Sequence, residues 1–272
     1  MQVAFLILLF VLGACLGSFL CCQVRRLHLK SQKKSSPKLG KRSVCLHCGE
    51  KLKWYDNLPI ISWLLLKGKC RKCHQKIGLT ELLSELGTGL AFLSLGFGAS
   101  LNGVVIGSRW VLPTEWWLLS FSLIFATILA FLAIYDGLYG ELPTLGLILA
   151  IIVAIIMVVF REWILFFMWR DMIDLLFAVL ILGGIYLVLY LVSKGKWVGD
   201  GDWLLGTAIA LALGNPLLAV LALFISNFLA CLVMLPVVKK THHTKIYFGP
   251  FMVVAFIIVY SFSGFFCDII SL

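Results

Sequence analysis

Long apolar segments constrain the fold of this chain more than any other feature of its sequence. Hydrophobic residues make up 61% of its 272 positions and charged residues 13%, whereas soluble domains are about 45–50% apolar and about 25% charged. The mean hydropathy is +1.03. A helix needs about 20 mostly apolar residues to cross a bilayer, and eight segments approach that length: 3–22, 82–100, 114–135, 142–160, 172–192, 203–213, 216–238 and 247–267.

These segments predict an all-α polytopic membrane protein with about eight transmembrane helices. The segment 203–213 is short, although a tilted helix or a locally thinned bilayer accommodates a short crossing. Counts of six or seven therefore stay open. Because the basic residues follow the first apolar segment instead of preceding it, we expect 3–22 to be an uncleaved transmembrane helix and not a signal peptide.

The Lys and Arg residues predict the orientation of these helices, since basic residues are retained on the cytoplasmic side of short loops. If the eight segments alternate in direction, twenty of the 23 Lys and Arg residues fall on one face, and fifteen of them lie between residues 25 and 76. That face is expected to be cytoplasmic. We attribute the net charge of +10 to this topology and expect contact with membrane lipid and with no nucleic acid. Added binding of anionic head groups or of nucleic acid is the alternative.

Two Cys-x-x-Cys pairs, CLHC at 45–48 and CRKC at 70–73, lie in the polar segment 23–80. Each pair can hold one Zn²⁺ from a tight turn, and two pairs complete a closed tetrahedral site. A closed site has no position for a catalytic water, so the zinc is expected to be structural and to supply folding free energy. Redox-active or simply buried cysteines are the alternative, and His47 and His74 are substitute ligands close by. The predicted zinc ligands are Cys45, Cys48, Cys70 and Cys73.

The polar segment divides the chain into three predicted parts: a first transmembrane helix at 1–22, a cytoplasmic zinc-binding domain at 23–80 and a transmembrane core at 81–272. Between its cysteine pairs the domain carries aromatic residues, among them Trp54 and Trp63. We expect these to form a minimal core or to lie at the membrane interface. A surface that docks a peptide or a cofactor is the alternative.

Carboxylates at the ends of apolar segments are the candidates for chemistry, because ionisable side chains are costly at a membrane boundary. Asp136 follows the segment 114–135, and Asp200 and Asp202 precede 203–213. Under the predicted topology both sites lie at the cytoplasmic boundary, where helix packing can bring them together. One of two facing carboxylates keeps a proton while the other acts as a base on water, which is the chemistry of aspartyl proteases.

These aspartates alone do not establish a protease. Aspartate is also a common cap of helix N-termini, so on these residues alone a transporter or a scaffold protein is favoured over a protease. Within the pair, Asp202 is the better catalytic candidate because it adjoins the apolar segment. Asp200 lies further out, where its charge is cheap and a structural or substrate-steering role suffices.

The motifs taken together resemble the type IV prepilin peptidases, which are bacterial inner-membrane aspartyl proteases of the GxGD type. The resemblance covers nearly the whole chain and rests on five features in the family's order. They are GSFLCCQVRRL at 17–27, the two CxxC pairs with WYDNLPIISWLLLKGKC between them, Asp136 with Pro143, GDGD at 199–202 and FGPFM at 248–252.

The resemblance implies an enzyme that removes the basic leader of type IV prepilins or pseudopilins at the cytoplasmic face, with Asp136 and Asp202 as the catalytic pair and the four cysteines as zinc ligands. In many members S-adenosylmethionine then serves to methylate the new N-terminal residue, but the resemblance identifies no residue that binds it. Cys21 replaces a family Asn and Leu204 a common Lys, departures that bear on methylation. A non-catalytic zinc-knuckle scaffold or assembly factor for a secretion or pilus system is the main alternative.

Overall fold

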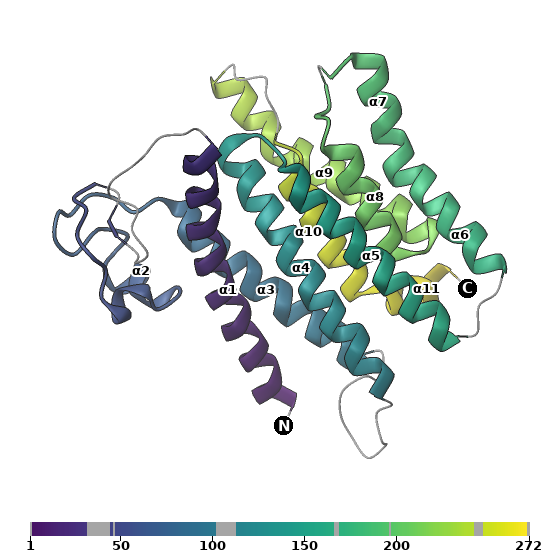
Figure 1. Cartoon of the computed structure of the whole chain (residues 1–272), viewed down its shortest axis with the longest axis horizontal. Helices are drawn as coiled ribbons and strands as arrows, with labels where there is room; N and C mark the ends of the chain where they lie inside the picture. Colours follow the sequence, from purple (N-terminus) through teal and green to yellow (C-terminus); the bar gives the residue numbers. More distant parts are fainter. Residues whose placement is uncertain are drawn as a thin grey trace. The chain divides into compact units, whose positions relative to one another are not determined.

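The computed structural model describes residues 2–31, 44–45, 47–101, 113–165, 169–195, 197–241 and 247–270. These residues form helices joined by turns, with two isolated β-bridges (Figure 1). Contacts divide the chain into two compact units, residues 3–93 and residues 94–272. The all-helical membrane fold predicted from the apolar segments is confirmed.

Unit 1 contains two long helices and the polar segment between them. Its first long helix, α1 (Gln2–Ser31), extends beyond the predicted first span at 3–22. The polar segment contributes a 3₁₀ turn, η1 (Trp54–Asn57), and a short helix, α2 (Ile61–Leu65). The second long helix, α3 (Leu79–Leu101), begins in unit 1 and ends in unit 2. The division of the chain into a first transmembrane helix at 1–22, a cytoplasmic zinc-binding domain at 23–80 and a transmembrane core at 81–272 stays a prediction.

Small residues let α1 and α3 approach closely within unit 1. A methyl group at Gly17 would overlap the Thr88 hydroxyl and would lie 2.9 Å from the Ser84 carbonyl carbon. The Thr88 hydroxyl also donates a hydrogen bond of 2.8 Å to the Gly13 carbonyl. Glycines four residues apart that face small polar residues are typical of helix packing in membranes, where backbone proximity replaces the hydrophobic effect.

Unit 2 is a helical bundle whose centre is a short helix, α8 (Asp202–Leu213). Eight of its twelve residues are buried. Helices α5 and α6, a π-helical turn η2 and α10 all pack against it, and α10 also packs against α4 and α9. The remaining bounds are α4 (Pro113–Tyr139), α5 (Thr144–Leu165), α6 (Trp169–Val179), η2 (Leu180–Gly184), α7 (Ile185–Ser193), α9 (Pro216–Thr241), α10 (Gly249–Ser261) and α11 (Ser263–Ile270).

Six helices in the described part of the chain are long and apolar enough to cross a membrane. They correspond to six of the eight predicted spans. The other two, 203–213 and 247–267, are the shorter apolar helices α8 and α10, so the eight-span prediction is met by six long helices and two short ones. At 1.5 Å per residue, the twelve residues of α8 rise only about 18 Å, against a hydrocarbon core of about 30 Å.

Candidate active site and metal centre

Asp136 lies in the last turn of α4, and its side chain is buried. The helix ends because Gly140 adopts a positive φ of 68° and its N–H returns to the Asp136 carbonyl at 2.7 Å. The side-chain carboxylate of Asp136 accepts a separate hydrogen bond, from the Gly249 N–H to Oδ2 at 2.9 Å. One oxygen of Asp136 is therefore held in place by a glycine 113 residues away.

Asp202 is the first residue of α8 and is also buried, whereas Asp200 is exposed. Asp202 Oδ2 accepts the N–H of Gly199 at 2.9 Å, which closes the Gly-Asp-Gly-Asp turn on itself. A methyl group at Gly201 would lie 2.6 Å from Leu142 Cβ, so this turn packs directly on the segment that follows α4. The structure thus buries Asp202, the predicted catalytic residue, and leaves Asp200 at the surface.

The ends of three helices bring the two buried aspartates together. Helix α10 packs against both α4 and α8, and its first residue, Gly249, donates to Asp136. Asp136 and Asp200 both act electrostatically on the Asp202 carboxylate. Two carboxylates that repel each other in a buried site favour a state in which one of them holds a proton. That is the state in which a carboxylate pair can act as acid and base toward a water molecule.

Two residues near the aspartates were missed by the sequence analysis. In the sequence Gly249 stands out only as part of the motif FGPFM at 248–252. No spacing between motifs predicts its contact with Asp136. Tyr186 looked like an ordinary aromatic residue of an apolar segment. Its ring lies 5.4 Å from that of Phe248, the residue before Gly249. Its hydroxyl lies 3.3 Å from the Ser226 hydroxyl and accepts a hydrogen bond of 3.3 Å from the Asn227 amide.

The four predicted cysteine ligands converge in unit 1. Their sulfur atoms all lie within 4.8 Å of one another, and no histidine belongs to the cluster among the residues that the structure describes. The sulfurs of Cys45 and Cys73 are 3.8 Å apart. A zinc–sulfur distance of about 2.3 Å places neighbouring sulfurs of a tetrahedron about 3.8 Å apart. The donor set therefore fits a tetrahedral zinc ion.

The two cysteine pairs are held by turns of the same design. The bridges Val44–Lys51 and Lys69–Lys76 each enclose one pair. In the first turn Gly49 donates to the Cys45 carbonyl at 2.9 Å, and in the second His74 donates to the Cys70 carbonyl at 3.0 Å. Gly49 and His74 both have positive φ values, 73° and 55°. His74 thus serves as a turn residue in this arrangement.

Backbone amides of the second turn favour the ionised form of one ligand. Hydrogen bonds from the N–H groups of Cys73 and Lys72 lower the pKa of the Cys70 thiol to about 7. A thiol must lose its proton to bind a metal ion. The turn therefore prepares Cys70 for metal binding near neutral pH.

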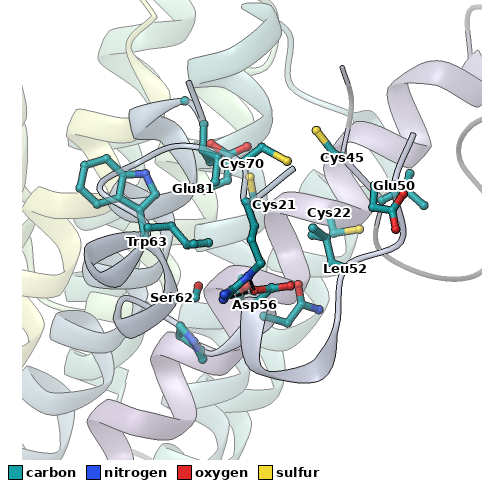
Figure 2. A pocket seen from close by; sticks show the side chains of 18 of the residues that line it. Cys21, Cys22, Cys45, Glu50, Leu52, Asp56, Ser62, Trp63, Cys70 and Glu81 are labelled. Carbon is teal, nitrogen blue, oxygen red and sulfur yellow. Dashed lines mark hydrogen bonds and ion pairs between the residues drawn. The ribbon is translucent and has the colours of Figure 1, made fainter. Parts of the chain in front are cut away.

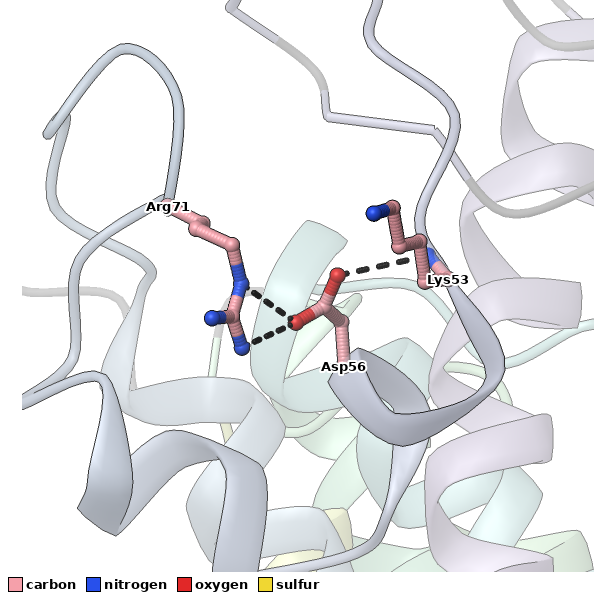
Figure 3. A network of polar contacts seen from close by, with 3 residues as sticks. All are labelled: Lys53, Asp56 and Arg71. Atoms are coloured by element: carbon pink, nitrogen blue, oxygen red, sulfur yellow. Dashed lines mark hydrogen bonds and ion pairs between the residues drawn. The ribbon is translucent and has the colours of Figure 1, made fainter.

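Polar contacts fasten the two turns to the rest of the insert (Figure 3). Asp56 Oδ1 accepts hydrogen bonds from Arg71 Nε at 3.0 Å and Arg71 Nη2 at 2.8 Å. Asp56 Oδ2 accepts the Lys53 N–H at 3.3 Å. The Arg71 guanidinium also stacks over the Tyr55 ring, 5.1 Å from its centroid. The second cysteine turn is thereby tied to η1, and the ion pair between Lys72 and Glu50 ties it to the first.

Comparison with known proteins gives two kinds of match. The family model described as the bacterial peptidase A24 N-terminal domain matches residues 11–98. A prepilin leader peptidase/N-methyltransferase of Myxococcus xanthus is 44% identical over 90 residues, which cover 33% of this chain and 25% of that protein. A protein of the same name from Vibrio cholerae is 42% identical over 89 residues, which cover 32% of this chain and 35% of that protein.

A longer alignment reaches across most of the chain. A prepilin leader peptidase/N-methyltransferase of Pseudomonas putida is 29% identical over 279 residues, which cover 92% of this chain and 88% of that protein. No solved structure matches the chain. The N-terminal family match, the full-length relative, the four-cysteine cluster and the buried aspartates in GxGD order agree with one another. The chain is thus similar to the prepilin leader peptidase/N-methyltransferases over most of its length, and its residues 11–98 match the bacterial peptidase A24 N-terminal domain.

Proposed function

We propose that this protein is a membrane aspartyl endopeptidase that removes the basic leader of type IV prepilins or pseudopilins and then methylates the new N-terminal residue. The observation that carries the peptidase is the pair of buried carboxylates, Asp136 and Asp202, each fixed by the backbone N–H of a glycine. Both activities are those of the similar proteins from Myxococcus xanthus and Pseudomonas putida, which are prepilin leader peptidase/N-methyltransferases. The protein acts in the inner membrane of a bacterial cell, with the aspartates and the zinc insert on the cytoplasmic side.

In the peptidase reaction the two aspartates share the work of acid and base. The ionised carboxylate removes a proton from a water molecule that attacks the scissile carbonyl, while the protonated one donates its proton to the carbonyl oxygen. The carboxyl group that took the proton from water then donates it to the leaving amine, and the other aspartate regains a proton from the gem-diol as the C–N bond breaks. The hydrogen bonds from Gly199 and Gly249 each occupy one carboxylate oxygen. The second oxygen of each aspartate is left for water and substrate.

The experiment compares three aspartate variants. The full-length protein is co-expressed with a prepilin that carries a basic leader, and the intact mass of the prepilin is measured. We expect Asp136→Asn and Asp202→Asn to abolish leader removal. Asp200→Asn, with its exposed side chain, should keep much of the turnover and weaken binding of basic leaders, most clearly at low salt where charge attraction is least screened.

Zinc content and membrane yield serve as the folding control for all three variants. If folded, zinc-loaded Asp136→Asn protein still removes the leader, the peptidase assignment is wrong and the zinc-knuckle scaffold is the better account. A mass increase of one methyl group on the cleaved prepilin reports the second activity separately.

A further inference from the structure

A buried tyrosine of unit 2, Tyr186, lies beside the start of α10. It is the second residue of α7, directly after the π-helical turn η2, and only 2% of it is exposed. Its ring packs on that of Phe248, with 5.4 Å between the centroids and 60° between the planes. Phe248 immediately precedes Gly249, whose N–H donates to Asp136 at 2.9 Å. The tyrosine therefore packs on the residue that leads into the hydrogen-bond donor of Asp136.

The same ring also lies beside α8, the helix that begins with Asp202. A methyl group at Gly206, one turn after Asp202, would lie 3.3 Å from Tyr186 Cδ2 and 3.0 Å from the Leu182 carbonyl oxygen. The absence of a side chain at Gly206 lets α8 approach η2 and Tyr186 closely. Turns of the π-helical kind are rare and are frequent at functional sites. One aromatic ring is thus packed between the first turns of α8 and the start of α10.

Two side chains of α9 hold the hydroxyl end of this tyrosine. Ser226 Oγ donates to the Leu223 carbonyl at 2.9 Å, and Asn227 Nδ2 donates to the same carbonyl at 2.8 Å. Because the Ser226 proton is directed to Leu223, the Tyr186 hydroxyl is the donor in its contact of 3.3 Å with Ser226 Oγ. The hydroxyl also accepts an N–H of Asn227 at 3.3 Å. The Tyr186 side chain is therefore fixed at both its ring and its hydroxyl.

We propose that Tyr186 is a positioning residue of the peptidase, whose ring holds the start of α10 in place relative to α8 and so keeps the Gly249 N–H on Asp136. The inference rests on the proposed peptidase function. In the described part of the chain the Tyr186 hydroxyl bonds to α9 and not to either aspartate. Tyr186 therefore acts through Phe248 and Gly249 and not on the substrate.

Removal of the ring would leave a space between Gly206 and Phe248. The surroundings of such a space relax only in part, and the start of α10 is free to move into it. A displacement of about 1 Å at a reacting group lowers a rate by about 100-fold. An effect of this kind falls on the transition state, so it lowers kcat and leaves KM little changed.

The first measurement is kcat and KM for leader removal from a purified prepilin by full-length protein in detergent. Tyr186→Leu removes the ring, and we expect its kcat to fall by about 10- to 100-fold with KM within about twofold. Tyr186→Phe keeps the ring and loses only the hydroxyl. It should keep kcat within about fivefold of the unmodified protein, as the loss of an ordinary hydrogen bond predicts.

Phe92→Leu is the matched control for the loss of a buried aromatic ring. Phe92 is also 2% exposed, and it belongs to unit 1. We expect Phe92→Leu to lower the Tm, as Tyr186→Leu does, because both leave a space in a packed interior. Its kcat should equal that of the unmodified protein. An equal fall of kcat in Phe92→Leu and Tyr186→Leu would reduce the role of Tyr186 to stability and overturn the inference.

A double variant tests whether Tyr186 acts through Gly249. Tyr186→Leu and Gly249→Ala both disturb the hydrogen bond from Gly249 to Asp136, so the double variant should be about as slow as the slower single variant. Two reductions that multiply would show that the residues act independently, and the inference would be wrong. A kcat of Tyr186→Phe as low as that of Tyr186→Leu would also contradict it, because the ring would then not be the part that matters.

Hydrogen exchange of peptides that contain Gly249, read by mass spectrometry, gives a result that does not depend on activity. We expect the Gly249 amide to exchange about tenfold faster in Tyr186→Leu, because a lost hydrogen bond removes its protection. Tyr186→Phe and Phe92→Leu should exchange at the unmodified rate, and unchanged exchange in Tyr186→Leu would overturn the inference. If the unmodified protein does not cleave prepilins, the proposed function fails, and this measurement still decides whether Tyr186 holds Gly249 on Asp136.

Discussion

At the scale of single residues, Gly249, the glycine that begins α10, fits closely against Asp136 of the candidate active site. The Gly249 N–H lies 2.9 Å from Asp136 Oδ2. A methyl group on Gly249 would lie 2.8 Å from the same oxygen and 3.3 Å from Asp136 Cβ. Any side chain at this position therefore pushes Asp136 away from the donor that orients it.

We expect Gly249→Ala to lower the rate of leader removal by about 100-fold, because displacing a reacting group by about 1 Å has effects of that order. The measurement is the initial rate of prepilin cleavage by purified protein. Gly137→Ala is the matched control, since a methyl group there would meet only Pro250 Cγ at an ordinary distance of 3.7 Å. Equal rates for the two variants would show that the Gly249 contact does not position Asp136.

The sequence predicted the aspartates but not the glycine, and the difference has a physical cause. A carboxylate beside an apolar segment is costly wherever the chain folds, so Asp136 and Asp202 attract notice from their local surroundings. The importance of Gly249 comes from a partner 113 residues away. Only the packing of α10 against α4 reveals it.

At the scale of helices, the contact between α1 and α3 depends on the absence of side chains. Gly17→Ala would drive a methyl group into the Ser84 backbone and the Thr88 hydroxyl. We expect it to destabilise the protein by about 1–3 kcal/mol, the usual cost of overpacking. Thermal unfolding in detergent measures the change as a lower Tm. Gly87→Ala, where a methyl group meets nothing within 4 Å, should leave the Tm unchanged or raise it, and a fall as large as that of Gly17→Ala would contradict this account.

The two turns that carry the cysteine pairs are also stabilised at the scale of local structure, and we expect their stability to depend on a bound zinc ion. Elemental analysis should find one zinc ion per chain. Removing it with a chelator should greatly increase the rate of trypsin cleavage within residues 47–77, because a small polar segment has little apolar surface to bury. Cys70→Ser should lose the zinc and Cys231→Ser, an exposed cysteine outside the cluster, should keep it. Full zinc content in Cys70→Ser would refute the four-thiolate site.

Helix lengths were the least predictable part of the fold. The apolar segments 203–213 and 247–267 were found correctly, because hydrophobic composition is a property of the local sequence. Helix α8 (Asp202–Leu213) ends where the predicted segment ends, whereas α10 (Gly249–Ser261) stops before the predicted end at residue 267. Helix α8 ends at Gly214, whose φ is 66°, and Arg161 Nη1 donates to the Leu213 carbonyl at 3.3 Å. Helix α10 ends at Ser261, and a separate helix α11 follows.

At the scale of the whole molecule, the two units carry different chemistry. The four-cysteine cluster and a cavity of about 800 Å³ (Figure 2) belong to residues 3–93, and the buried aspartates belong to residues 94–272. The resemblance to the prepilin peptidases and the four-cysteine cluster were predictable from motifs with fixed spacing. The cavity of unit 1 was not predictable, because its lining comes from α1, the polar insert and α3. The only indication of it in the sequence was the alternative that the aromatic residues of the insert form a docking surface.

Most residues of α8 are buried, and this packing limits how far the enzyme can change its conformation around Asp202 during cleavage. Amides in the well-packed interior of a helix exchange their hydrogens with solvent only through large opening events, so the interior turns of α8, where most residues are buried, should be among the slowest to exchange in unit 2. A peptide bond inside a helix is engaged in i→i−4 hydrogen bonding and covered by neighbouring turns. Under the proposed function, the enzyme is the rigid partner, and the substrate has to present its scissile peptide bond to the aspartates in an open conformation.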